Sequence, residues 1–134
     1  MKIKALVFSN GELQEREIEN TLESLQEIVG GYIESPYISN IFRENDIDII
    51  LNEEGKILNL QEEIAIIDKE KNIVIDVLCG NCIFVSHDEQ GETIGLNDEQ
   101  IKIIKKELNY VVNLSKINEE TGNIENIDMR ALLV

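Results

Sequence analysis

The chain has 134 residues, and 43% of them are apolar but only 4% are aromatic, so the core must be aliphatic. Its length fits one domain, which we predict over residues 1–134. The formal net charge of −15 disfavours direct binding to nucleic acid or to an anionic membrane, because both depend on Lys and Arg. We expect a cytoplasmic protein, since no apolar run approaches the roughly 20 residues of a membrane helix and no signal-peptide pattern is present.

A β-hairpin is predicted at the start of the chain. Residues 2–8 alternate between polar and apolar side chains, which is typical of a half-buried strand. Asn10-Gly11 follows, and this pair favours a tight hairpin turn because Gly adopts positive φ freely. Residues 13–19 then form a second, mostly polar strand.

Three acids of that second strand are our candidate interaction residues: Glu15, Glu17 and Glu19. In an extended strand they project to one face, about 7 Å apart, because side chains alternate with period two. Two interpretations remain open. The charges either block edge-to-edge pairing of the sheet, or form a ladder that faces a basic groove on a partner protein.

A helix is predicted after residue 21. Asn20 and Thr21 are both capping residues, and Glu23 lies three positions after Asn20, as in a capping box. Leu22, Leu25, Ile28 and Val29 share one helical face. We expect Gly30 and Gly31 to end the helix, with at least one at positive φ, and we take Gly30, Gly31 and Tyr32 as a structural motif.

The middle of the chain alternates between strand-like and irregular segments. We expect an extended piece at 32–35, a loop or irregular strand at 36–45, a strand at 47–52, a hairpin turn at 53–56, a returning strand at 57–60 and an ambiguous segment at 61–67.

The second half contains two apolar strands and a second helix. The predicted elements are a turn at 69–72, strands at 73–79 and 82–86, a polar loop at 87–95 and a helix capped by Asn97 and Gln100 whose apolar stripe runs to Val112. Residues 113–134 are an extra C-terminal segment. Because the connections are short, we predict an α+β fold: a mostly antiparallel sheet of five or six strands with two amphipathic helices on one face.

Cys79-Gly80-Asn81-Cys82 has the spacing of redox and metal motifs. Redox pairs commonly lie at a helix N-terminus, whereas an apolar strand follows here. Zinc needs two further ligands, and His87 is the sole histidine. We therefore interpret Cys79 and Cys82 as structural thiols that are either buried or flank a turn. If Gly80-Asn81 is a tight turn, the two cysteines face each other across the end of a hairpin.

No catalytic, metal or cofactor site is predicted. Ser86, His87 and Asp88 are the residue types of a catalytic triad, but three consecutive residues of a strand point to alternate sides. Paired acids such as Glu62-Glu63 lack a spaced partner for general acid–base chemistry. Phosphate-binding fingerprints are absent, so we lean towards a protein that is not an enzyme.

Four segments, at residues 22–34, 51–56, 84–85 and 95–101, resemble the Domain of Unknown Function 3846 family, and the helix followed by Gly-Gly-Tyr-Ile-Glu is the most specific part. The resemblance covers about residues 1–108. It implies an accessory protein of phages, plasmids or integrated elements and implies no chemistry. The sequence departs from the family pattern at residues 59–62 and at both cysteines.

Two functions follow as hypotheses. The first is a mobile-element accessory protein that binds a host protein, in its sharpest form an inhibitor of a host defence system. The strong acidity would then serve docking onto a basic partner, although solubility alone also explains such a charge. The alternative is a module that binds or sequesters a small ligand or nucleotide.

Overall fold

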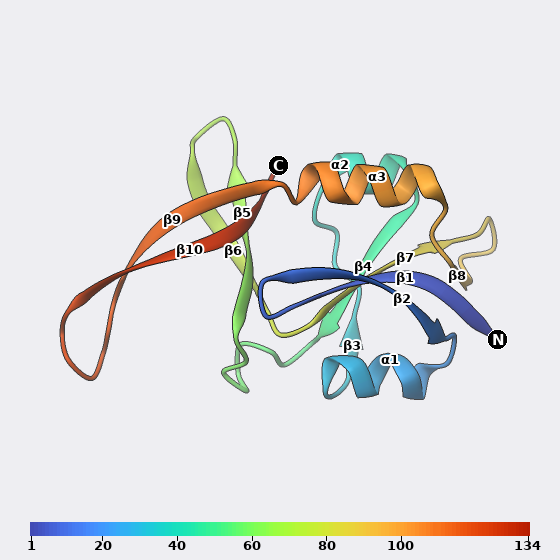
Figure 1. Cartoon of the computed structure of the whole chain (residues 1–134), viewed down its shortest axis with the longest axis horizontal. Helices are drawn as coiled ribbons and strands as arrows, with labels where there is room; N and C mark the ends of the chain where they lie inside the picture. The colour runs from blue at the N-terminus through green and yellow to red at the C-terminus, as the bar shows by residue number, and fades with distance from the viewer.

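The computed structural model describes all 134 residues and contains two β-sheets and three helices (Figure 1). The first sheet has the strand order β2-β1-β7-β4-β3, with β8 beside β7, and every pairing in it is antiparallel. Its strands are β1 (Lys2–Ser9), β2 (Glu12–Glu19), β3 (Ile33–Glu34), β4 (Ile47–Asn52), β7 (Cys82–His87) and β8 (Thr93–Ile94).

The second sheet has the order β6-β5-β10-β9. Its strands are β5 (Glu62–Asp68), β6 (Ile73–Cys79), β9 (Tyr110–Ile117) and β10 (Ile124–Leu133). Only β5 and β10 pair in parallel. The predicted mostly antiparallel α+β fold is thus confirmed, but a second sheet was not expected.

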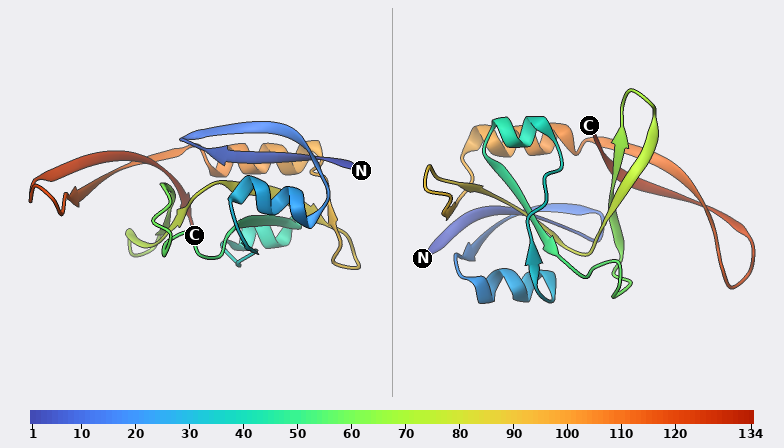
Figure 2. Two further views of the ribbon diagram at one scale, coloured as in Figure 1. Left: turned by 90° about the horizontal axis from the view of Figure 1, so that it is seen from below. Right: turned by 180° about the vertical axis from the view of Figure 1, so that it is seen from behind.

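The helices cover both faces of the first sheet, so the prediction of a single covered face was wrong. They are α1 (Leu22–Val29), α2 (Asn40–Glu44) and α3 (Asp98–Glu107). Figure 2 shows α1 on the side opposite α2 and α3. The reason is that the central strands are apolar on both sides: in β1, Leu6 and Phe8 join the core with α2, α3 and the second sheet, while Ala5 and Val7 pack with α1. None of the helices could span a bilayer.

The hairpin at the start of the chain is confirmed. Asn10 and Gly11 both have positive φ, at 53° and 78°, and β1 and β2 pair along eight residues. This turn matches the right-handed twist of its strands because both central residues lie in the left-handed region. β2 is the outermost strand of the sheet.

Helix α1 begins and ends close to the expected positions, but its cap differs from the prediction. Thr21 is the N-cap and accepts a hydrogen bond from the Ser24 N–H, whereas the amide of Asn20 donates instead to the Thr93 carbonyl. Gly30 ends the helix with φ at 80°, which confirms the expected positive φ.

Three expectations in the middle of the chain need correction. The segment at 36–45 contains the short helix α2, which begins at the N-cap Ser39. The expected hairpin at 53–60 is wrong: these residues form a series of turns that connects the two sheets, and Ile57 is 81% exposed. The ambiguous segment at 61–67 is the buried strand β5.

The predicted hairpin between the two cysteines is also wrong. β6 belongs to the second sheet and β7 to the first, so the chain changes sheet at Gly80. Cys79 pairs with Glu62 and Cys82 with Phe8, so the cysteines do not face each other across one hairpin. Local strand preference cannot show which sheet a strand joins.

The capping box of α3 is confirmed, since Asn97 and Gln100 satisfy each other's backbone N–H groups. The helix ends at Glu107, so Val111 and Val112 belong to β9 and not to the helical stripe. Residues 113–134 fall within the long hairpin β9–β10, which projects away from the rest of the molecule (Figure 1).

Candidate functional site

The negative charge is concentrated on one stretch of the chain. Residues 17–55 contain ten acids and one base, Arg43. This stretch carries the end of β2, helix α1, strand β3 and strand β4. These acids lie on both faces of the first sheet, since Glu23 and Glu27 belong to α1 whereas Glu17 lies on the side of Lys4 and α3. Asp46 and Asp48 contact His87 instead.

Tyr32 lies in this stretch between α1 and β3 and is 66% exposed. Gly30 turns the chain out of α1, and Gly31 packs so closely against the Asn52 amide that a Cβ would lie 2.9 Å from its nitrogen. Asn52 is buried and donates to the Val29 carbonyl at 3.2 Å. The Tyr32 carbonyl accepts a hydrogen bond of 3.0 Å from the Glu53 N–H. The backbone of Tyr32 is thus held while its ring faces solvent.

Five carboxylates accompany Tyr32, and we call this set the acidic surface: Glu23, Glu27, Glu34, Glu53 and Glu54. Glu34 pairs with Leu51 in the β3–β4 ladder, and the Glu54 N–H donates to the buried Asn52 side chain at 2.8 Å. None of the five carboxylates forms an ion pair. A cation near this set, Lys56, interacts electrostatically with Glu34 but forms its ion pair with Asp76.

The two acids of α1 have opposite effects on the stability of their own helix, because Glu23 lies in the first turn, where the helix dipole favours an acid. Glu23 and Glu27 are four positions apart, where like charges repel by a few tenths of a kcal/mol. Glu27 also lies in the last turn, where the helix dipole favours a cation, and that turn has no basic residue. Glu27 is therefore the acid whose position in the helix lowers stability.

The row Glu15, Glu17 and Glu19 lies on the edge strand, as its two interpretations require. All three face the same side as Lys2 and Lys4, their neighbours on β1. Lys4 Nζ lies 3.6 Å from Glu15 and 3.9 Å from Asp98 at the start of α3, so the row borders that helix.

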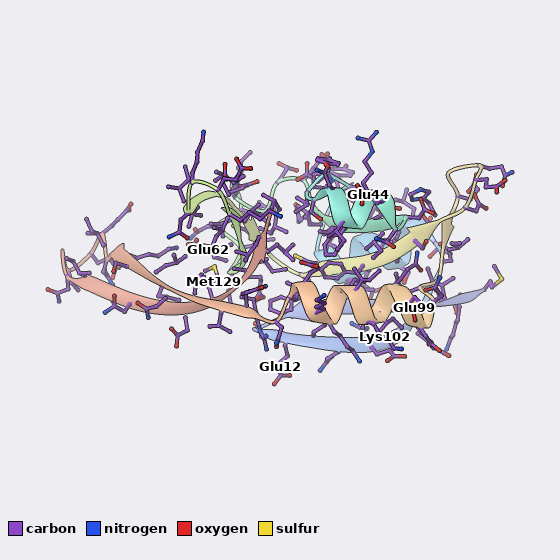
Figure 3. All side chains as sticks on the ribbon, turned by 90° about the horizontal axis from the view of Figure 1, so that it is seen from above. Glu12, Glu44, Glu62, Glu99, Lys102 and Met129 are labelled. Atoms are coloured by element: carbon purple, nitrogen blue, oxygen red, sulfur yellow. The ribbon has the colours of Figure 1, made fainter.

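The charge of this row is partly neutralised. The N-terminal amino group lies 3.2 Å from the Glu19 carboxylate, while Glu17 has no ion-pair partner. Glu99 and Lys102 on α3, which lie alongside β1 and β2 in Figure 3, form a further pair at 3.7 Å. The row lies on an edge strand and its charge is partly neutralised. Both features favour the interpretation that the row prevents edge-to-edge pairing over the interpretation that it docks onto a partner.

Ser86, His87 and Asp88 do not form a triad. The Ser86 side chain is buried. Its hydroxyl donates a hydrogen bond of 2.8 Å to the Asp46 carbonyl and accepts one of 2.9 Å from the Gln100 side-chain amide. The Asp88 carboxylate accepts from backbone N–H groups of its own turn. The serine and the histidine therefore have different partners, as expected for adjacent strand residues.

His87 instead lies between two carboxylates. Its Nδ1 is 2.9 Å from Asp48 and its Nε2 is 3.4 Å from Asp46. The hydrogen bond with Asp48 raises the pKa of His87 above the usual 6.5, against the opposing effect of burial. Asp48 belongs to β4, whereas Asp46 precedes that strand with a positive φ of 57°.

The two cysteines are free and buried. Burial raises the pKa of the Cys82 thiol to about 12, with Glu63 adding to the effect, and burial also raises the pKa of Cys79. Such thiols remain protonated at neutral pH, and the thiolate is the reactive form. The geometry gives neither cysteine the activation that redox chemistry requires.

A hollow of about 420 Å³ lies where β10 separates from β5, beside Glu62 and Met129 (Figure 3). Only three of its eleven lining residues are apolar, whereas ligand pockets are mostly apolar. Its cations are engaged, since Lys116 pairs with Glu62 and Arg130 donates to the Leu108 carbonyl. A ligand would first have to break these interactions.

Comparison with protein families tests the family resemblance that the motif around Tyr32 suggested. The family model of the Domain of unknown function (DUF3846) matches residues 1–109. The chain belongs to this family. Neither a curated protein nor a solved structure matches the chain.

The DUF3846 match ends just before β9, so the hairpin β9–β10 lies outside it. The DUF3846 part includes the whole first sheet, all three helices and the acidic surface with Tyr32. Sequence patterns identified Gly30, Gly31 and Tyr32 as a motif but did not show that Tyr32 lies beside Glu53. The pairing of β3 with β4 brings these two residues together. The only signal in the sequence was the scarcity of bases between residues 17 and 55.

Proposed function

We propose that this chain is a non-enzymatic binding protein of a mobile element that acts on a host protein, and that it docks through the acidic surface around Tyr32. An inhibitor of a host defence system is the sharpest form of this proposal. The family resemblance supports the mobile-element origin, and the charge supports a basic partner.

The exposure of Tyr32 among unpaired carboxylates is the observation that carries the proposal. All three Phe residues are buried, whereas Tyr32 is 66% exposed on a backbone fixed by Gly31 and Asn52. A rigid exposed Tyr is a frequent centre of binding energy, because it buries a large area and loses little conformational entropy. The surrounding acids would accelerate association with a basic target and exclude acidic proteins.

The test is affinity purification from the natural host with three versions of the chain. Tyr32→Ala combined with Glu34→Gln and Glu53→Gln removes the centre of the surface, and all three side chains lie outside the core. A matched control carries Glu119→Gln and Glu120→Gln in the exposed turn between β9 and β10, with the same change of charge. We expect the wild type and the control to retain a partner that the surface variant loses.

Binding of the purified partner, measured at two salt concentrations, then distinguishes long-range electrostatic attraction from direct contacts in the complex. The association rate with the wild type should fall as salt rises, and the variant should show a smaller dependence. A partner retained equally by all three versions would contradict the proposal.

The alternative function, a small-ligand or nucleotide module, would use the hollow beside Glu62 and Arg130. It predicts that a nucleotide or another anion raises the melting temperature in a concentration-dependent way. Arg130→Gln should abolish that shift, whereas the variant at Tyr32 should keep it.

A further inference from the structure

The two sheets differ in how their edges are protected. In the first sheet, β2 carries five charged residues among eight and β3 is only two residues long. Charges and short strands both prevent an edge from pairing with another chain. In the second sheet, a register shift at Ile75 interrupts the pairing of β6. Such a bulge also discourages edge pairing.

β9 has much less protection than the other edges. It is eight residues long, pairs with β10 without a bulge and contains no acid, although the chain carries a net charge of −15. Its single charged residue is Lys116. A long, regular and nearly uncharged edge is a site for addition of a further strand.

The hydrogen bonds of the hairpin determine which backbone groups of β9 face outwards. The Asn118 N–H donates to the Asn123 carbonyl at 2.8 Å and closes the ladder. Because antiparallel pairs alternate between bonded and non-bonded types, the groups that point away from β10 belong to Val111, Asn113, Ser115 and Ile117. These residues therefore offer four N–H donors and four carbonyl acceptors at the edge.

We propose that β9 pairs with β9 of a second copy of this chain, antiparallel and across a two-fold axis at Asn113. The backbone restricts the register, because outward-facing groups of one copy must meet outward-facing groups of the other. Among the registers that remain, the axis at Asn113 is the one that places Lys116 opposite Tyr110 of the second copy. Asn113 then pairs with its equivalent, and Val111 pairs with Ser115 of the second copy. The second sheets of the two copies join into one sheet of eight strands.

The side chains in this register are complementary. Tyr110, Val112 and Leu114 lie on the face of the second sheet that carries Ala65, Ala131 and Met129. Val112 and Leu114 are only half-buried in one copy. In the pairing, Val112 lies opposite Leu114 of the second copy, so the apolar face continues across the axis.

Charge also favours a second copy at this edge. Lys116 lies opposite Tyr110 of the second copy, where a cation can stack on the ring, and no like charges oppose each other. The hairpin projects from the body (Figure 1), so the interface lies away from the acidic surface. The repulsion between two acidic bodies is then reduced, because salt screens charges beyond about 8 Å at physiological ionic strength.

The experiment compares the molar mass of the full chain and three variants by size-exclusion chromatography with light scattering, across a wide range of concentration. Asn113→Pro removes an outward N–H without removing a β9–β10 backbone bond, and such a position tolerates Pro. Asn113→Ala is the matched control, because it keeps the N–H and loses the same side-chain bond to Asp128. Asn113→Lys places two like charges opposite each other only in this register, because within one copy the new cation faces Asp128.

We expect a twofold larger mass at high concentration for the wild type and Asn113→Ala, and the mass of one chain for Asn113→Pro and Asn113→Lys. Circular dichroism verifies that each variant is folded, and Asn113→Lys decides the result if the Pro variant does not fold. A wild type with the mass of one chain at all concentrations would overturn the proposal and leave the edge to a strand of another protein. Equal dimerisation of all folded variants would also overturn it. Neither result affects the acidic surface, which lies on the other sheet.

Discussion

The carboxylate of Glu63 accepts a hydrogen bond of 2.7 Å from the backbone N–H of Asn10, 53 positions earlier in the chain. Its other oxygen accepts the Gly11 N–H at 3.1 Å, so one side chain satisfies both central residues of the β1–β2 turn. A β-bulge in the pairing of β5 with β6 falls at Glu63. Bulges redirect a side chain, and this one joins the second sheet to the first.

Loss of this carboxylate should destabilise the fold. Glu63 is only 4% exposed, and Glu63→Ala leaves two partly buried N–H donors without an acceptor, which we expect to lower the free energy of unfolding by on the order of 3 kcal/mol. Glu63→Gln keeps one acceptor and should cost roughly half as much. Urea unfolding measures both values. The neighbouring Glu62→Gln removes an exposed ion pair and should cost less than about 1 kcal/mol, so equal effects at the two positions would contradict the assignment.

The two glycines after α1 should respond differently to substitution. Gly30→Ala forces a Cβ into the left-handed region and should cost about 1 kcal/mol, whereas Gly30→Asn should cost less because Asn tolerates that region. Gly31→Ala should cost more, on the order of 2 kcal/mol, because the new Cβ would displace the buried Asn52 amide from its bonds to Val29 and Glu54. Unchanged thermal stability in both Ala variants would show that neither constraint operates.

The charge of His87 should make stability depend on pH. A pKa raised in the folded state means that the folded chain holds the proton more tightly, so the stabilisation is complete below the unfolded pKa of about 6.5. It is lost as the pH rises through the raised value. Asp48→Asn removes the principal cause and should flatten this dependence.

Two measurements test this prediction. As the sole histidine, His87 gives imidazole NMR signals that need no further assignment, and their midpoint should lie above 6.5 and fall in Asp48→Asn. The melting temperature of the wild type should decrease as the pH rises through the raised pKa of His87. A wild-type midpoint at or below 6.5 would refute the ion-paired imidazolium.

The row on β2 gives a further prediction. Replacement of Glu15, Glu17 and Glu19 by Gln removes charge from an edge strand, and we expect the variant to self-associate in size-exclusion chromatography because the edge becomes free to pair. The affinity for a partner that binds the acidic surface should stay unchanged. If the variant instead has the mass of the wild type and binds that partner more weakly, the docking interpretation of the row is correct.

Much of the local structure was predictable from the sequence. The Asn10-Gly11 turn, the end of α1 at Gly30, the limits of β4 and the capping box of α3 each depend on residues close together in the chain. Such features follow from the φ preferences of a few residues and from side chains that satisfy nearby backbone groups. The sequence therefore determined where these elements begin and end.

Only the tertiary structure decided which strands share a sheet and which residues meet. β6 and β7 are two residues apart in the chain yet lie in different sheets, and Glu63 reaches a turn 53 positions away. The burial of both faces of β1 and the position of Tyr32 beside Glu53 also depend on distant segments. The physical reason is that strand pairing and side-chain packing depend on contacts between remote parts of the chain, whereas turns and caps depend on neighbours.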